Sequence, residues 1–126
     1  MERIRFITHS GHRVLFIDMT GCTPVEVAGL STEIPEHVMK EPPGSVLILA
    51  DLSGAEFSKE ALARMKLAVA KDKPFLKRSA WIISNNLPRE YHQALRSFSG
   101  RDLHLFSSRE EALGFLVEAE MKSQAS

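Results

Sequence analysis

The sequence has little of what a secreted or membrane protein needs. Its 126 residues include one cysteine, Cys22, so no disulfide can form within the chain, and we expect a reducing compartment. No apolar run approaches the roughly 20 residues of a membrane-spanning helix. The first residues lack the basic and apolar regions of a signal peptide. We therefore expect a cytoplasmic protein without a transmembrane segment.

An excess of charge of either sign is also lacking. Sixteen basic and sixteen acidic residues give a formal net charge of zero, so we expect no nucleic-acid partner and no attraction to anionic membranes. Lys71, Lys73, Lys77 and Arg78 stand close together, but Asp72 lies among them; we interpret this run as a solvated loop, with a local basic patch as the alternative. The hydrophobic fraction of 44% is that of an ordinary globular domain.

Catalytic and metal-binding motifs are missing as well. The sequence contains no phosphate-binding glycine loop, no nucleophile elbow and no metalloprotease motif. Cys22 has no histidine at a diagnostic spacing, and His9 with His12 would supply only two ligands of a metal site. We therefore predict that the chain is not an enzyme and has no catalytic residue, no cofactor and no metal ion.

The sequence does contain a regular alternation of strand and helix signals. Residues 3–8 and 13–19 are strand-like and are separated by a turn, so these two strands must be antiparallel. Three further strand-like runs follow, each after a helical pattern; they are residues 46–50, 75–84 and 103–106. Strands connected through a helix run parallel. We predict an α/β fold with a five-stranded mixed sheet, an N-terminal antiparallel hairpin and a mostly parallel remainder.

The first two helices are predicted from their caps. The run Thr23–Glu26 has the form of a capping box with proline at the first helical position. Pro35 predicts a kink or a break near residues 31–34. Ser58 is a suitable N-cap for the second helix, which we expect to end near Lys71.

Two more helices complete the predicted cover of the sheet. The third starts at Pro88 and is closed by Gly100, and the fourth opens with a second capping box at Ser108–Glu111. Residues 121–126 should fray. No linker divides residues 1–126, so we expect a single domain with about four helices.

The central stretch Ser45–Leu62 connects the predicted sheet to a candidate site. Its apolar strand ends at Asp51, and Ser53 and Ser58 follow in the turn and at the next helix start. Open α/β folds gather their functional groups at the carboxyl edge of the sheet. Asp18, at the end of the second strand, belongs to the same edge. These four polar residues form the candidate edge for binding a partner or ligand.

Two motifs and the hairpin together carry a family resemblance. The motifs are Asp-Leu-Ser-Gly-Ala-Glu-Phe at 51–57 and Phe-Ser-Gly-Arg at 98–101. The chain thereby resembles the SpoIIAA-like proteins, small and mostly uncharacterised bacterial proteins grouped with STAS domains (sulfate transporter and anti-anti-sigma factor) and with lipid-binding CRAL-TRIO domains. The resemblance covers Ile4 to Leu116 and implies a single SpoIIAA-like domain.

The resemblance also implies where a phosphorylation switch would lie. In anti-anti-sigma factors of this type, an Asp-Ser pair at the helix start carries the serine that a partner kinase phosphorylates. The matching positions here are Glu60 and Ala61, and neither accepts phosphate. We interpret the nearby Ser58 as an N-cap, with phosphorylation as the alternative. The implied module therefore lacks the usual phospho-acceptor serine.

Two classes of function remain open. The first is a non-enzymatic regulatory or protein-interaction module that binds a protein partner or itself, with a homodimer as the expected oligomer. The alternative, implied by the relation to CRAL-TRIO domains, is a small carrier of a lipid or other apolar ligand. Its candidate apolar pocket combines residues of the first and third helices: Leu30, Ile34, Val38, Tyr91, Leu95 and Phe98.

A phosphate-switched receiver domain is a third interpretation. In that class an aspartate at the end of a central strand accepts the phosphoryl group, and Asp51 has this position, with Asp18 as its companion. The initial hairpin and the missing acidic pair after the first strand disfavour it. We instead expect both aspartates to accept hydrogen bonds from turn amides.

Overall fold

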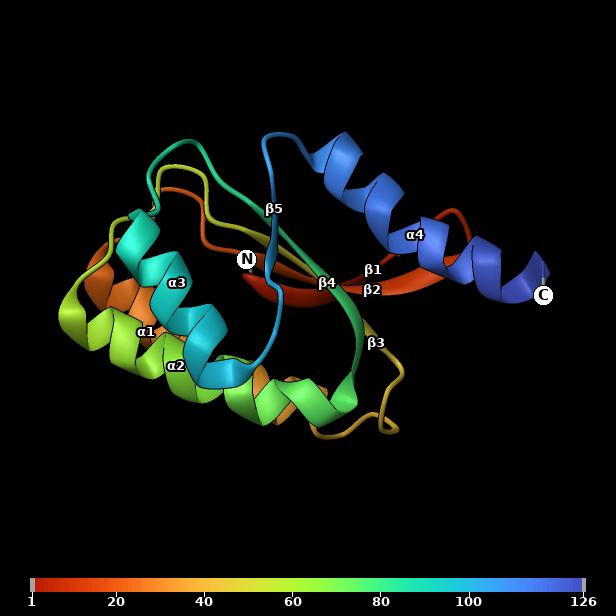
Figure 1. The fold of residues 1–126 in the computed structure, drawn as a ribbon, viewed down its shortest axis with the longest axis horizontal. Coiled ribbons are helices and arrows are strands. Elements are labelled where there is room, and N and C mark those ends of the chain that lie inside the picture. Colours follow the sequence, from red (N-terminus) through yellow and green to blue (C-terminus); the bar gives the residue numbers. More distant parts are fainter. Residues whose placement is uncertain (1, 126) are drawn as a thin grey trace.

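A five-stranded mixed sheet with helices on both faces forms the molecule (Figure 1). The computed structural model describes residues 2–125, and their side chains as far as Glu118. Neighbouring strands follow the order β1-β2-β3-β4-β5. The strands are β1 Ile4–His9, β2 His12–Asp18, β3 Val46–Asp51, β4 Leu76–Ile82 and β5 His104–Phe106.

The first two strands form the predicted hairpin. They are antiparallel, with Ile4 opposite Ile17 and His9 opposite His12. Gly11 in the turn has a φ of 78°, a conformation that glycine adopts without steric cost. The other neighbouring pairs, β2 with β3, β3 with β4 and β4 with β5, are parallel. The predicted fold class is confirmed.

The helices divide unequally between the two faces of the sheet. They are α1 Pro24–Val38, α2 Lys59–Asp72, α3 Arg89–Ser99 and α4 Arg109–Ala125, with a short 3-10 helix, η1, at Lys73–Phe75. Right-handed crossovers between successive parallel strands place their helices on one face. Accordingly α1, α2 and α3 lie together, while α4 covers β3, β4 and β5 from the other side (Figure 1). Helix α4 continues to Ala125, residue 126 lies outside the described residues, and the fraying expected for residues 121–126 stays a prediction.

The helix caps lie where the sequence predicts them. Thr23 accepts a hydrogen bond from the amide of Glu26, whose side chain bonds back to the amide of Thr23. Ser58 caps α2, and Ser108 accepts a bond from an amide in the first turn of α4. Gly100 closes α3 in the left-handed conformation, with a φ of 70°. These local capping signals are confirmed.

A break at Pro35 does not occur, so that part of the prediction is wrong. Helix α1 runs without interruption from Pro24 to Val38. Proline removes only the one hydrogen bond to the carbonyl of Ser31. Because Ile34, Pro35 and Val38 are all buried, packing in the last turns offsets that loss and the helix continues.

Two apolar cores sandwich the sheet. The larger core, beneath α1, α2 and α3, includes Ile17 and Ile48, and the smaller one, beneath α4, includes Phe16 and Leu49. All six residues of β3 are buried, as expected for a central strand covered on both faces.

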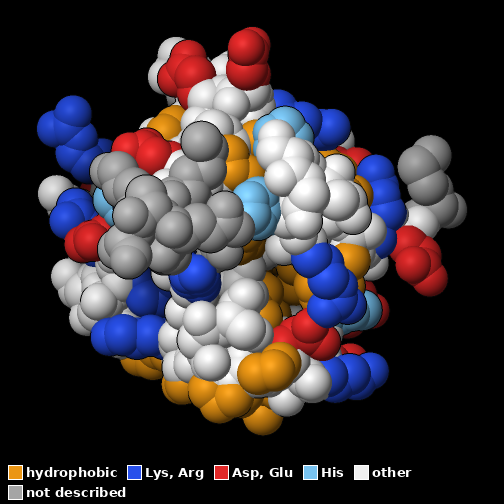
Figure 2. All heavy atoms as spheres, turned by 90° about the vertical axis from the view of Figure 1, so that its right-hand side faces the viewer, with side chains coloured by type: hydrophobic (Ala, Val, Ile, Leu, Met, Phe, Trp, Pro, Cys, Tyr) orange, Lys and Arg blue, Asp and Glu red, His pale blue; other side chains and the backbone are white. Residues whose placement is uncertain are grey.

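The surface carries charges of both signs. Figure 2 views the side where α4 ends and shows Lys, Arg, Asp and Glu side chains scattered over that face. Large apolar side chains that remain exposed include Val25, Met39, Leu67 and Phe98. In the described part of the chain, no helix is both long and apolar enough to cross a bilayer.

Candidate functional site: the carboxyl edge of the sheet and the interior cavity

Asp18 and Asp51 lie side by side at the carboxyl edge of the sheet. They are paired residues of the adjacent strands β2 and β3. Asp18 Oδ1 accepts hydrogen bonds from the amide and the hydroxyl of Thr20, at 3.0 and 2.6 Å. Asp51 Oδ1 accepts one from the amide of Ser53 at 3.0 Å. Each carboxylate thus closes the turn that follows its strand.

An arginine stands near each of these carboxylates. Arg3 Nη1 is 3.8 Å from Asp18 Oδ1. Arg109 Nη2 is 3.8 Å from Asp51 Oδ2. Partial burial acts to raise the pKa of Asp18, but the hydrogen bonds from its turn and the charges of the two arginines outweigh burial, so the pKa is lowered. The charge of Asp18 is therefore stabilised by groups of its own chain.

Of the two serines of the predicted edge, Ser58 caps a helix with its side chain, whereas Ser53 makes its hydrogen bonds through its backbone. Ser58 Oγ accepts a hydrogen bond from the amide of Ala61 at 3.1 Å and caps α2. Glu60 and Ala61, which the family resemblance matches to a phosphorylated pair, carry no hydroxyl; Glu60 is exposed and Ala61 is fully buried. Ser53 is half-buried, and its carbonyl accepts a bond from the amide of Gly21 at 3.0 Å.

Asn86 also belongs to this edge, although it was not among the site residues predicted from the sequence. Its Nδ2 donates to the carbonyls of Leu52 and Ala55, both at 2.8 Å. Its Oδ1 accepts from the amide of Ser84 at 2.9 Å, and Ser84 Oγ accepts from the amide of Gly54 at 2.9 Å. The available sequence signal, Ser-Asn-Asn after a strand, predicts a turn but not its bonds to a second loop.

Backbone hydrogen bonds connect a third loop to these two. The amide of Gly21 donates to the carbonyl of Ser53 at 3.0 Å, and the amide of Glu56 donates to the carbonyl of Cys22 at 2.9 Å. The loops after β2, β3 and β4 are therefore cross-connected into one surface, here named the carboxyl-edge platform. It consists of residues 19–23, 52–57 and 83–87.

The six residues predicted to form an apolar pocket are spread over several environments. Ile34 lines the interior cavity described below. The other five extend from core to surface: Val38 and Leu95 are buried, Leu30 and Tyr91 are half-buried, and Phe98 is 54% exposed. Helix α2 packs against both α1 and α3, so the structure does not gather the six around one space.

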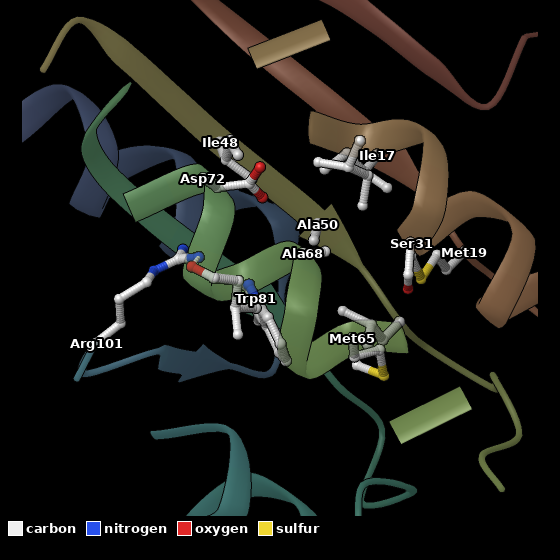
Figure 3. A pocket seen from close by; sticks show the side chains of 13 residues that line it. Ile17, Met19, Ser31, Ile48, Ala50, Met65, Ala68, Asp72, Trp81 and Arg101 are labelled. Carbon is white, nitrogen blue, oxygen red and sulfur yellow. Dashed lines mark hydrogen bonds between the residues drawn. The ribbon is translucent and has the colours of Figure 1, made fainter. Parts of the chain in front are cut away.

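An interior cavity lies between α2 and the sheet (Figure 3). Its volume of about 30 Å³ has room for about two water molecules, since one water needs about 10–15 Å³. Most of its wall is apolar and includes Ile48 and Trp81. The polar or charged side chains in its lining are Ser31, Asp72 and Arg101.

Asp72, the last residue of α2, has an unusual environment in this wall. It is 3% exposed, and its Oδ1 is buried without a hydrogen-bond partner among the described residues. In Figure 3 its carboxyl group points from α2 toward β3, beside Ile48. Burial raises the pKa of Asp72 to about 7, while the charge of Arg101 acts in the opposite direction. An unpartnered oxygen beside a cavity of this size is a binding position for a small donor such as water.

Arg101, which lines the same cavity, is fixed by two hydrogen bonds. Its Nη1 donates to the carbonyl of Val69 at 3.0 Å, and its Nη2 donates to Ser79 Oγ at 2.8 Å. Burial lowers the pKa of Arg101 to about 10, while the charge of Asp72 acts in the opposite direction. The solvated-loop interpretation of residues 71–78 is wrong for Asp72, which lies in the interior.

Other groups with potential chemistry are placed apart. Among the residues that the structure describes, no group of three or more His, Cys, Asp or Glu is arranged to hold a metal ion. Cys22 is buried. Burial raises the pKa of its thiol, although the charge of Arg3 opposes this. A buried thiol with a raised pKa is a weak nucleophile.

Comparison of the chain with protein-family models, with curated proteins and with solved structures found no match. The function of the chain is therefore inferred from its own residues.

Proposed function

We propose that this chain is a non-enzymatic regulatory or protein-interaction module of the SpoIIAA-like type, which binds a protein partner or a second copy through the carboxyl-edge platform. The observation that carries the proposal is the hydrogen-bonded connection of the three loops. Asn86 joins two of them, and the amides of Gly21 and Glu56 join the third. A preorganised surface loses little conformational entropy when it binds.

The state of the carboxylates supports docking over catalysis. A general acid or base works best with a pKa near the working pH, whereas the pKa of Asp18 is lowered from its usual value. Asp51 is 8% exposed and closes its own turn. Both groups therefore support the shape of the platform and offer little to a substrate.

The outer surface of the platform suits a transient protein interface. Thr20, Gly54, Glu56 and Asn85 are exposed and give it a polar character. Val25, in the first turn of α1 and two residues beyond the platform, is 82% exposed. Interfaces between proteins that also exist alone combine apolar contacts with a polar rim.

The test is the oligomeric state and the partner of the chain purified from its own cells. Chemical cross-linking at native expression level, followed by native mass spectrometry, should show a homodimer or a stoichiometric complex with one protein. The double substitution Val25→Asp with Glu56→Arg should weaken that complex by about tenfold or more. Glu36→Arg, in the last turn of α1, is the control for Glu56→Arg, because it makes the same charge reversal on an exposed residue away from the platform.

A monomer without a stoichiometric protein partner would contradict the proposal, as would equal effects of the platform and control substitutions. Co-purified lipid would instead favour the alternative function, a small carrier of an apolar ligand. The apolar walls of the interior cavity support that alternative. However, its volume of about 30 Å³ is far below the roughly 300–1,000 Å³ of typical ligand pockets.

A further inference from the structure

Strand β5 is shorter than the strand beside it, and the difference leaves an open groove. β5 pairs only with Ala80–Ile82, whereas β4 begins at Leu76. Within the described chain, no strand therefore lies beside Leu76–Ser79 on the side away from β3. A groove of about 440 Å³ separates these residues from the segment Gly100–His104.

Cations dominate the lining of this space, here named the basic groove. Lys73, Lys77, Arg78 and Arg101 all line it. Asp102 is the one carboxylate among its lining residues. Because the whole chain has a formal net charge of zero, the groove is a local concentration of positive charge, which attracts an anionic partner.

Two further residues strengthen the positive charge around the groove, one by adding a cation and the other by turning its carboxyl group away. Arg96 lines an adjoining hollow that shares residues 100–102 with the basic groove. Asp72, which is next to these lysines in the sequence, is turned into the interior and is 3% exposed. Its raised pKa of about 7 leaves it partly neutral near neutral pH. The negative charge of Asp72 therefore offsets less of the positive charge at this junction than the sequence indicates.

Hydrogen bonds hold the walls of the groove in place. Arg101 donates to Ser79 Oγ at 2.8 Å. Arg78 Nη1 donates to the carbonyl of Phe115 at 2.7 Å, and its guanidinium carbon lies 3.9 Å from the centre of that ring. Lys73 Nζ reaches a carbonyl of the opposite wall at 3.4 Å. Arg101, Arg78 and Lys73 are thus positioned before any partner arrives, and the oxygens that they bind here are uncharged carbonyl and hydroxyl groups.

We propose that the basic groove binds an extended acidic segment of a protein partner, which adds a strand beside Leu76–Ser79. This inference rests on the protein-interaction function proposed above and specifies the chemistry of the partner. An open strand edge presents backbone N–H and C=O groups that another peptide backbone can satisfy, which a nucleic acid does not supply. Four residues of strand extend over about 13 Å. A second copy of the same edge would be repelled by its like charge, so the occupant is a different, acidic chain.

The test uses two labelled peptides and the full-length protein. The first peptide alternates glutamate and valine, and the second has the same sequence with every backbone amide N-methylated, so that neither edge of the peptide can donate a hydrogen bond. In fluorescence anisotropy we expect saturable binding of the first and binding weaker by about tenfold or more for the second, because it keeps its charge but cannot pair fully as a strand. In amide NMR spectra, the first peptide should shift the signals of residues 76–79.

Charge-reversal variants locate the binding site. Lys73→Glu combined with Lys77→Glu should weaken binding of the first peptide by about tenfold or more. Lys59→Glu combined with Arg89→Glu makes the same charge change on exposed residues at the starts of α2 and α3, and should leave binding unchanged. Circular dichroism would confirm that all variants fold.

Several outcomes would overturn this inference. Equal binding of both peptides would show that the groove attracts any polyanion and forms no strand pair. Tighter binding of oligothymidylate that shifts the amide signals of residues 76–79 would indicate a nucleic-acid surface. Failure of the first peptide to bind, with the platform-dependent complex intact, would refute the acidic strand and leave the proposed function standing. Absence of that complex as well would refute both.

Discussion

Replacing the buried carboxyl group of Asp72 by an amide should stabilise the protein at neutral and alkaline pH. Asp72→Asn keeps the shape of the side chain and removes its charge. The carboxyl group has a folded-state pKa of about 7, against 3.8 for an ordinary aspartate. Because one pKa unit corresponds to about 1.4 kcal/mol, keeping this group ionised inside the fold costs about 4 kcal/mol.

The sign of the effect follows from which state holds the proton. Below about pH 4, Asp72 is protonated in both the folded and the unfolded chain, so it imposes no cost. Between about pH 4 and pH 7 the unfolded chain releases the proton first, and stability falls as pH rises. Above that range the full cost remains. The buried asparagine amide has a cost of its own, about 0–2 kcal/mol, which is the same at every pH. We therefore expect Asp72→Asn to gain about 2–4 kcal/mol at pH 8 and to lose about 0–2 kcal/mol at pH 4, so that the effect changes by about 4 kcal/mol between the two pH values.

Urea denaturation between pH 4 and pH 8 measures this prediction directly. Trp81, the single tryptophan, is 5% exposed and lines the same cavity, so its fluorescence reports unfolding around Asp72. Glu33→Gln is the control, because it makes the same chemical change on an exposed side chain. A stability difference between wild type and Asp72→Asn that does not vary with pH would refute the reasoning. It would show that the folded and unfolded chains bind this proton equally well.

Three further substitutions test the cap and the platform. Ser58→Ala removes the cap of α2 and should lower the free energy of unfolding by about 1 kcal/mol; Ser58→Asp should preserve it, as urea denaturation would show. Gly54→Ala should cost about 1 kcal/mol, because the φ of Gly54 is 71°. Its control, Gly29→Ala, lies in α1 with open space around it and should instead raise stability by about 0.5–1 kcal/mol. Asn86→Ala leaves two loop carbonyls without their donor and should cost about 2 kcal/mol, with faster hydrogen exchange at residues 52–57. Unchanged hydrogen exchange at residues 52–57 in Asn86→Ala would show that the side chain of Asn86 does not hold the platform together.

Most of the fold could be predicted because its signals are local. The short turn at Gly11 permits only an antiparallel pair, and the alternation of strands with helices after it favours parallel neighbours. Thr23, Ser58 and Gly100 mark helix ends through the bonds of their own neighbourhood. The break predicted at Pro35 is wrong because the packing of the buried residues around it offsets the local cost of the proline.

The polar interior could not be predicted from residue types alone, although one spacing pointed to it. Asp72 stands among lysines in the sequence, which favours a surface position. However, it follows Met65 by seven residues, Ala68 by four and Val69 by three, so it falls on the buried face of α2. The cross-loop bonds of Asn86 had no comparable signal, because they depend on how three loops meet after the sheet has formed.

Arg101 connects the two polar features of the molecule, because it lines both the interior cavity and the basic groove. When Asp72 is ionised, its charge offsets part of the charge of Arg101; when Asp72 is protonated, that charge acts fully on the groove. An acidic segment should therefore bind more tightly at about pH 6 than at about pH 8, and its binding should raise the pKa of Asp72 in return. Asp72→Asn should remove this part of the pH dependence, and His104→Gln would separate the contribution of the histidine in the groove. The same pH profile in wild type and Asp72→Asn would show that the cavity and the groove act independently.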